Sequence, residues 1–103
     1  MNELRVDFKR LDWQVGSSGV RFKAAARDDK QLRVVEIDPD IQQDWCVTGH
    51  VGYVLQGNLE IEFHDGTKRF GAGDGFIIRA GEAERHKPKA MGSVVKLVLV
   101  EDV

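Results

Sequence analysis

The sequence predicts an all-β fold in which roughly eight or nine short strands form a sandwich or a small barrel. The first observation is strict alternation. Residues 59–63 read Leu-Glu-Ile-Glu-Phe, so that the apolar side chains share one face of an extended segment. The second is that glycine-rich turns separate such segments. The third is that no window of helical length has an apolar period of about 3.6 residues.

The strand pattern recurs along the chain. In order, it covers residues 4–8, 20–24, 32–37, 49–56, 59–63, 68–70, 76–78, 84–87 and 94–100. The first two segments alternate between apolar and polar residues, which is typical of strands with one exposed face. The segment 76–78 is apolar on both faces, so we expect a buried central strand there. Residues 84–87 precede Pro88, which favours an extended backbone, and 94–100 is the most hydrophobic segment.

Turn residues separate these strands. The second and third segments form a hairpin, which ends at Asp38-Pro39-Asp40 because proline cannot donate to a strand ladder. His64-Asp65-Gly66 is a tight hairpin signal, since Gly66 can adopt a positive φ, and we expect His64 in an exposed turn. We expect one domain over residues 1–103, with an N-terminal strand and loop at 1–19 and the barrel at 20–100.

Length and composition limit the classes of function. The chain has 103 residues, which suits one domain with one core. Its net charge is −2 with both signs mixed and no basic run, so we expect no nucleic-acid partner. No apolar stretch reaches the ~18 residues of a membrane helix, so we expect no membrane partner. A single cysteine excludes an internal disulfide, and the first residues lack the apolar core of a signal peptide, which predicts a cytoplasmic protein.

Two segments resemble the motifs of the cupin superfamily. Residues 50–57 read HVGYVLQG, where many cupins have an E-x-x-Y-V-L-x-G string. Residues 73–81 supply the G-D and A-G positions of the second motif. The resemblance covers roughly residues 20–100. It implies a double-stranded β-helix barrel of the jelly-roll (cupin) type, and it also implies a homodimer.

The resemblance further implies a metal site, with ligand types that depart from the family's pattern. Where cupins usually place two histidines one residue apart, this chain has Asp44 and Cys46. His50 stands at the glutamate position, and Glu84 stands at the histidine of the second motif. An extended segment would place residues 44, 46 and 50 on one face. Cupin topology would direct that face, and the one bearing Glu84 and His86, into the barrel.

The candidate metal ligands are therefore Asp44, Cys46, His50, Glu84 and His86. Such a mixed set of sulfur, nitrogen and oxygen donors favours zinc, iron or nickel over magnesium, because a thiolate is a soft ligand. Each residue also has a structural interpretation. Cys46 is then a buried core thiol, Asp44 a turn residue, Glu84 an exposed carboxylate, and His86 a surface residue beside Arg85 and Lys87. His50 in an apolar barrel wall would need a hydrogen-bond partner.

Cys46 and His50 also fit a nucleophile–base pair. That interpretation lacks an oxyanion donor, because no glycine-rich loop lies next to Cys46. We therefore assign no catalytic residue from the sequence.

Three functions remain open at this point. The first is a metal-dependent cupin acting on a small molecule, for which the resemblance implies an isomerase, a decarboxylase or a dioxygenase. The second is a metal-free module that binds a small ligand in the barrel. The third is a mainly structural barrel that forms a homodimer, since segments 76–78 and 94–100 carry more apolar surface than a small monomer can cover. The sequence does not decide whether the protein is an enzyme.

Overall fold

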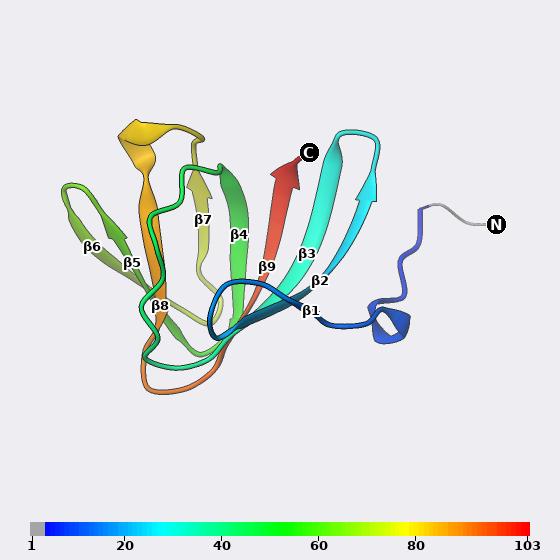
Figure 1. The fold of residues 1–103 in the computed structure, drawn as a ribbon, viewed down its shortest axis with the longest axis horizontal. Coiled ribbons are helices and arrows are strands. Elements are labelled where there is room, and N and C mark those ends of the chain that lie inside the picture. Colours follow the sequence, from blue (N-terminus) through cyan, green and yellow to red (C-terminus); the bar gives the residue numbers. More distant parts are fainter. Residues whose placement is uncertain (1–3) are drawn as a thin grey trace.

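A computed structural model describes residues 4–103, whose regular secondary structure is almost entirely β-strand (Figure 1). The elements are the short 3-10 helices η1 (Phe8–Arg10) and η2 (Glu82–Glu84) and the strands β1 (Gln14–Val15), β2 (Val20–Arg27), β3 (Lys30–Ile37), β4 (His50–Gln56), β5 (Asn58–Phe63), β6 (Gly66–Gly71), β7 (Gly75–Ile78), β8 (His86–Ala90) and β9 (Val95–Asp102). One antiparallel sheet has six strands in the order β1-β2-β3-β9-β4-β7, and the other has three in the order β6-β5-β8. The late strands β8 and β9 thus lie beside much earlier ones, as in a double-stranded β-helix. The predicted all-β jelly roll is confirmed.

The register of β9 brings polar residues of three strands together. It pairs with β3 through Gln31↔Glu101 and with β4 through Val51↔Val100. His50 begins β4 immediately before Val51, so this register carries His50 alongside Glu101. A histidine and a carboxylate that are far apart in the sequence therefore meet at one end of the larger sheet.

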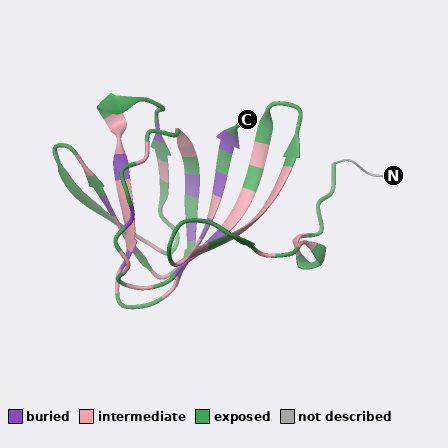
Figure 2. Ribbon diagram, in the orientation of Figure 1, coloured by how far each residue is buried: buried purple, intermediate pink, exposed green. Residues whose placement is uncertain are grey.

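The core lies between the two sheets and uses one face of each strand (Figure 2). Val95, Leu97 and Leu99 of β9 are buried, and the residues between them are less so. Leu59 and Ile61 of β5 face them from the smaller sheet and are almost fully buried. Each such side chain stabilises the fold by about 1.5–3 kcal/mol. The alternation predicted for residues 59–63 is confirmed.

Two predicted strands differ from the structure. Residues 4–8 were expected to be extended, but Phe8–Arg10 forms η1. The reason is local: the carboxylate of Asp7 accepts a hydrogen bond from the backbone N–H of Lys9 at 3.1 Å and caps the turn. Residues 76–78 were expected to form a central strand, but β7 is the edge strand of the six-stranded sheet, and Ile77 is 79% exposed.

The segments that flank the predicted ligands are also less regular than expected. Asp40 adopts a φ of 62° and begins an irregular connection to β4. In the connection between β3 and β4, Pro39 and Cys46 each form only an isolated β-bridge, and regular pairing starts at His50. Likewise, η2 occupies residues 82–84, so that β8 begins at His86 rather than at Glu84. Within residues 4–103, no helix has the length and apolar character needed to cross a membrane.

Candidate metal centre

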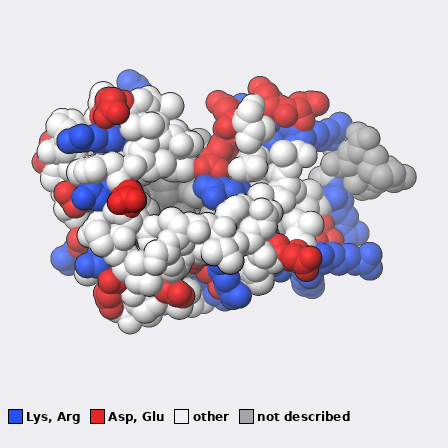
Figure 3. Space-filling view, in the orientation of Figure 1, with Lys and Arg blue, Asp and Glu red and all other residues white. Residues whose placement is uncertain are grey.

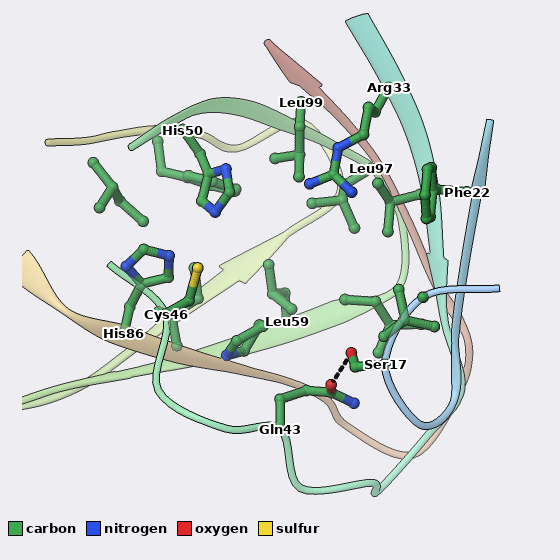
Figure 4. Close-up of a pocket in the computed structure, with 18 of the residues that line it drawn as sticks. Ser17, Phe22, Arg33, Gln43, Cys46, His50, Leu59, His86, Leu97 and Leu99 are labelled. Carbon is green, nitrogen blue, oxygen red and sulfur yellow. Dashed lines mark hydrogen bonds between the residues drawn. The ribbon is translucent and has the colours of Figure 1, made fainter. Parts of the chain in front are cut away.

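Three of the predicted ligands meet inside the barrel. One donor atom from each of Cys46, His50 and His86 lies within 4.8 Å of the other two. They come from three different segments: the connection before β4, the start of β4 and the start of β8. Figure 4 shows the thiol and the two imidazoles directed toward a common point at one end of a pocket. We call these three residues the Cys-His-His cluster.

The backbone holds Cys46 and His86 side by side. The N–H of Cys46 donates to the carbonyl of His86 at 2.8 Å, and the N–H of His86 donates to the carbonyl of Cys46 at 2.9 Å. This isolated antiparallel bridge ties the irregular connection to the first residue of β8. The thiol position is therefore fixed by backbone hydrogen bonds, although no regular strand carries it.

His86 presents an unpaired ring nitrogen to the cluster. Its residue is only 2% exposed, and Nδ1 lies 2.9 Å from the backbone carbonyl oxygen of Glu84. Because a carbonyl oxygen only accepts, Nδ1 must carry the hydrogen, and in the neutral ring Nε2 is left with a free lone pair. Among residues 4–103, Nε2 has no hydrogen-bond partner. An unpaired buried polar atom is unfavourable by about 1–3 kcal/mol unless something binds to it.

His50 is held from the other side by Glu101. Its Nδ1 lies 2.6 Å from Oε2 of Glu101. The two atoms are close, but they lack the alignment of a hydrogen bond within the described chain, so we treat the contact as mainly electrostatic. Burial lowers the pKa of His50 more than the charge of Glu101 raises it. His50 is therefore neutral at neutral pH, which is the form that coordinates metal ions.

Glu101 is the residue that the sequence analysis missed. Its carboxylate accepts hydrogen bonds from Nε of Arg33 at 2.6 Å and from Nη2 of Arg33 at 2.8 Å. Burial alone would raise the pKa of Glu101, but the hydrogen bonds and charge of Arg33, with a smaller contribution from His50, lower it overall. The signal was available in β9, because Glu101 continues the inward-facing positions of Leu97 and Leu99.

Asp44 and Glu84 are not brought into the cluster. Asp44 is exposed and lies outside the cluster, although it is one of the residues that line the pocket. The carboxylate of Glu84 accepts a hydrogen bond from the backbone N–H of Arg79 at 3.0 Å. Glu84 contributes to the centre through its backbone carbonyl, which orients His86. Residues 44, 46 and 50 all line the same pocket, but no regular strand runs through residues 44–49, and Asp44 is outside the Cys-His-His cluster.

The cluster opens onto a cavity of about 270 Å³ between the two sheets. Its walls are mainly apolar and include Val35, Leu59 and Leu97. At the end away from the cluster, Oγ of Ser17 donates to Oε1 of Gln43 at 2.6 Å (Figure 4). Nε2 of Gln43 donates to the backbone carbonyl of Ser18 at 2.7 Å, so the two loops at this end are tied together.

Comparisons with known proteins agree on the fold. No protein-family model and no curated protein matches the chain. Solved structures do match. KdgF from Halomonas sp. has a TM-score of 0.78 at 22% identity, over 91% of this chain and 89% of that one. A cupin-2 domain containing protein from Shewanella frigidimarina has a TM-score of 0.68 at 27% identity, over 80% of this chain and 79% of that one. The polyketide cyclase RemF from Streptomyces resistomycificus has a TM-score of 0.80 at 19% identity, over 95% and 78%.

These neighbours confirm the predicted resemblance to the cupin superfamily and its jelly-roll fold. The chain thus has the jelly-roll fold of the small cupins. Inside this barrel lies a Cys-His-His cluster, backed by the ion pair of Glu101 with Arg33.

Proposed function

We propose that this cupin barrel binds one divalent transition-metal ion through Cys46, His50 and His86 and holds a small molecule in the adjoining cavity. The observation that carries this proposal is the buried Nε2 of His86, which faces the thiol and the second imidazole without a hydrogen-bond partner among residues 4–103. A metal ion would satisfy its lone pair. The hydrogen bond at Nδ1 is the usual support for a metal-bound histidine.

The donor set favours zinc, iron or nickel. One soft sulfur and two imidazole nitrogens are typical ligands of these metals and poor ligands for magnesium or calcium. Three protein ligands leave a coordination position for a further group, as in catalytic zinc sites. When bound, such an ion would act as a Lewis acid on an oxygen of the small molecule.

The surrounding residues have separate tasks in this proposal. Glu101 orients His50, and the carbonyl of Glu84 orients His86. Arg33 keeps Glu101 ionised, as the lowered pKa of this carboxyl indicates. The apolar walls of the cavity limit the access of water to the ligand. A thiol ligand requires reducing conditions, which supports the cytoplasmic location expected from the sequence.

We propose that the chain is a metal-dependent enzyme acting on a small substrate. Solved structures with this fold include a polyketide cyclase and a sugar phosphate isomerase, so the fold accommodates several reactions. The second candidate is a metal-free ligand-binding barrel. The mainly apolar cavity favours it, because such a cavity can hold a ligand without any metal.

Elemental analysis of protein purified without an affinity tag tests the metal proposal. We expect close to one equivalent of zinc, iron or nickel, and loss of that metal in Cys46→Ala and His86→Ala variants. The matched control is His64→Ala, since His64 is exposed in the turn after β5. Less than about a tenth of an equivalent in the wild-type protein, even after incubation with each metal, would favour the metal-free candidate.

We also propose a homodimer. The outer face of β4 carries the exposed side chains of Val51, Tyr53 and Leu55, and Ile77 of β7 lies beside Val51. An exposed apolar patch of this kind is typical of a protein–protein interface. Figure 3 shows charged side chains of both signs spread over the face in view. A second copy of the chain is the partner that the family resemblance implies.

A further inference from the structure

One nitrogen of Arg33 is not used in the support of the candidate metal centre. Arg33 extends from β3 into the cavity, and Figure 4 shows its guanidinium between the Cys-His-His cluster and Phe22. Nε and Nη2 donate to the two oxygens of Glu101. The third nitrogen, Nη1, makes no hydrogen bond to any residue in the range 4–103. A charged donor is therefore available at the cluster end of the cavity.

The rest of the cavity is suited to an apolar group. Val35, Ile37 and Leu97 line it and belong to the hydrophobic core. The side-chain amide of Gln43 is already occupied by Ser17 and by the backbone of Ser18. The walls thus offer few free polar groups for a sugar or another many-hydroxyl compound, because such a ligand would lose hydrogen bonds to water without replacement.

The balance of charge favours a ligand with one negative charge. The charges of Arg33 and Glu101 cancel within their ion pair. A divalent cation together with the thiolate of Cys46 leaves one positive charge, and His50 and His86 are neutral as ligands. A buried site of net charge +1 is neutralised by a monoanion and would repel an ammonium group. The other charged side chain in the lining, Asp44, is exposed to solvent, which screens its charge.

We propose that the ligand of this cavity is a small organic monoacid with an apolar body. Its carboxylate accepts a hydrogen bond from Nη1 of Arg33 beside the Cys-His-His cluster, and its apolar body lies along Val35, Ile37 and Leu97. The proposal rests on the proposed function for the site. It adds the class of ligand and gives Arg33 a role in recognition. The cavity of about 270 Å³ restricts the ligand to a compact molecule.

The test compares three probes by isothermal titration calorimetry on zinc-loaded protein: isocaproate, its neutral amide isocaproamide, and acetate. We expect isocaproate to bind about tenfold or more tightly than isocaproamide, because only the acid pairs with a charged donor. We expect acetate to bind at least about a hundredfold more weakly than isocaproate, because it lacks the apolar body. Equal binding of acid and amide would overturn the inference.

Substitution of Arg33 provides a second measurement. We expect Arg33→Met to bind zinc more weakly, because Glu101 loses the partner that keeps it ionised. At zinc concentrations that still load the variant, we expect it to lose the preference for the acid over the amide. The matched control is Arg69→Met, since Arg69 is exposed and pairs with Glu60 at 3.2 Å. A retained preference for the acid in a folded Arg33→Met protein would contradict the role of Arg33. Should this variant not fold, the acid–amide comparison on the wild-type protein still decides whether the ligand is a monoacid.

Failure of the metal proposal can be told apart from failure of this inference. Zinc content is measured first, on the protein alone. If zinc binds and acid and amide bind equally, the ligand class is wrong and the metal site stands. If zinc does not bind, the metal site is wrong. The acid–amide comparison on metal-free protein then decides the ligand class, and equal binding overturns it.

Discussion

Nδ1 of His50 lies 2.6 Å from Oε2 of Glu101, and this contact joins the candidate metal centre to a buried ion pair. Arg33 holds Glu101 on the other side through two hydrogen bonds. His50, Glu101 and Arg33 come from neighbouring strands β4, β9 and β3. The sheet register therefore positions one ligand of the cluster.

Glu101→Gln is the variant that tests this arrangement. It keeps the size of the side chain and removes its charge, so it leaves the guanidinium of Arg33, which is largely buried with 20% of its side chain exposed, without an ionic partner. We expect the free energy of unfolding to fall by about 3 kcal/mol, and zinc affinity to fall about tenfold or more because His50 loses its support. Urea denaturation and competitive metal titration measure the two effects. Glu62→Gln is the control, since Glu62 is exposed on β5. Unchanged zinc affinity in Glu101→Gln would show that Glu101 is only structural.

His86→Gln separates metal binding from stability. Gln can still place an amide near the carbonyl of Glu84, so the metal-free protein should remain folded. We expect zinc to raise the melting temperature of the wild-type protein, because it binds only the folded state. It should leave that of His86→Gln unchanged. Differential scanning fluorimetry with chelator or zinc measures this, with His64→Gln as the control. An equal zinc-induced shift in His86→Gln would remove His86 from the ligand set.

Acidification should destabilise the metal-free protein in two stages. Burial lowers the pKa of His50 from the ordinary 6.5, and Arg33 lowers the pKa of Glu101 from 4.5 against the effect of burial. In both cases the unfolded chain binds the proton more tightly than the folded chain does. The contribution of each group to the free energy of unfolding is therefore fully present above the ordinary pKa of that group and is lost as the pH falls below it. Glu101, Arg33 and His86 are the charged and titratable groups that act on His50.

Urea denaturation at a series of pH values from about 8 to about 4 measures this dependence. This range includes the ordinary pKa values of histidine and glutamate. The free energy of unfolding should begin to fall below about pH 6.5, and His50→Gln should lack this first stage. Rising stability on acidification through this range would be inconsistent with a buried neutral His50.

Ile77→Glu tests the proposed dimer. Ile77 is on the outer face of β7, and a charge there would be unfavourable inside an apolar interface. We expect a dimer for the wild-type protein and a monomer for Ile77→Glu, by size exclusion with light scattering at micromolar concentration. Val15→Glu is the matched control, because Val15 is also highly exposed and lies on β1 at the other edge of the sheet. A wild-type monomer would contradict the proposal.

The fold could be predicted from the sequence because strand alternation and turn residues are local signals. Residues 59–63 show this, since their alternation matches the burial of Leu59 and Ile61. The position of β7 at the sheet edge could not be predicted from the sequence. An apolar residue such as Ile77 indicates a surface that is covered, but it does not indicate whether the same chain or another molecule covers it.

Only part of the candidate site could be predicted, because residue types and motif positions are local signals and contacts between distant strands are not. Cys46, His50 and His86 were identified by residue type and motif position, and the structure brings them together. Asp44 was placed with them on the assumption of a continuous strand, which the irregular connection before β4 does not provide. The inward direction of Glu101 follows from the alternation of β9. Its contact with His50 depends on the pairing of β9 with β4, and such long-range register is not visible in the sequence.

Titration of the metal-free, reduced protein with cobalt(II) is the most direct test of the Cys-His-His centre. The chain has one cysteine, so any thiolate-to-cobalt charge-transfer absorption must arise from Cys46. We predict that this absorption appears and saturates at one equivalent of cobalt, and that it is absent from Cys46→Ser and weakened in His50→Gln and His86→Gln. A wild-type protein that shows no such absorption, or a Cys46→Ser protein with an unchanged spectrum, would contradict the proposed centre.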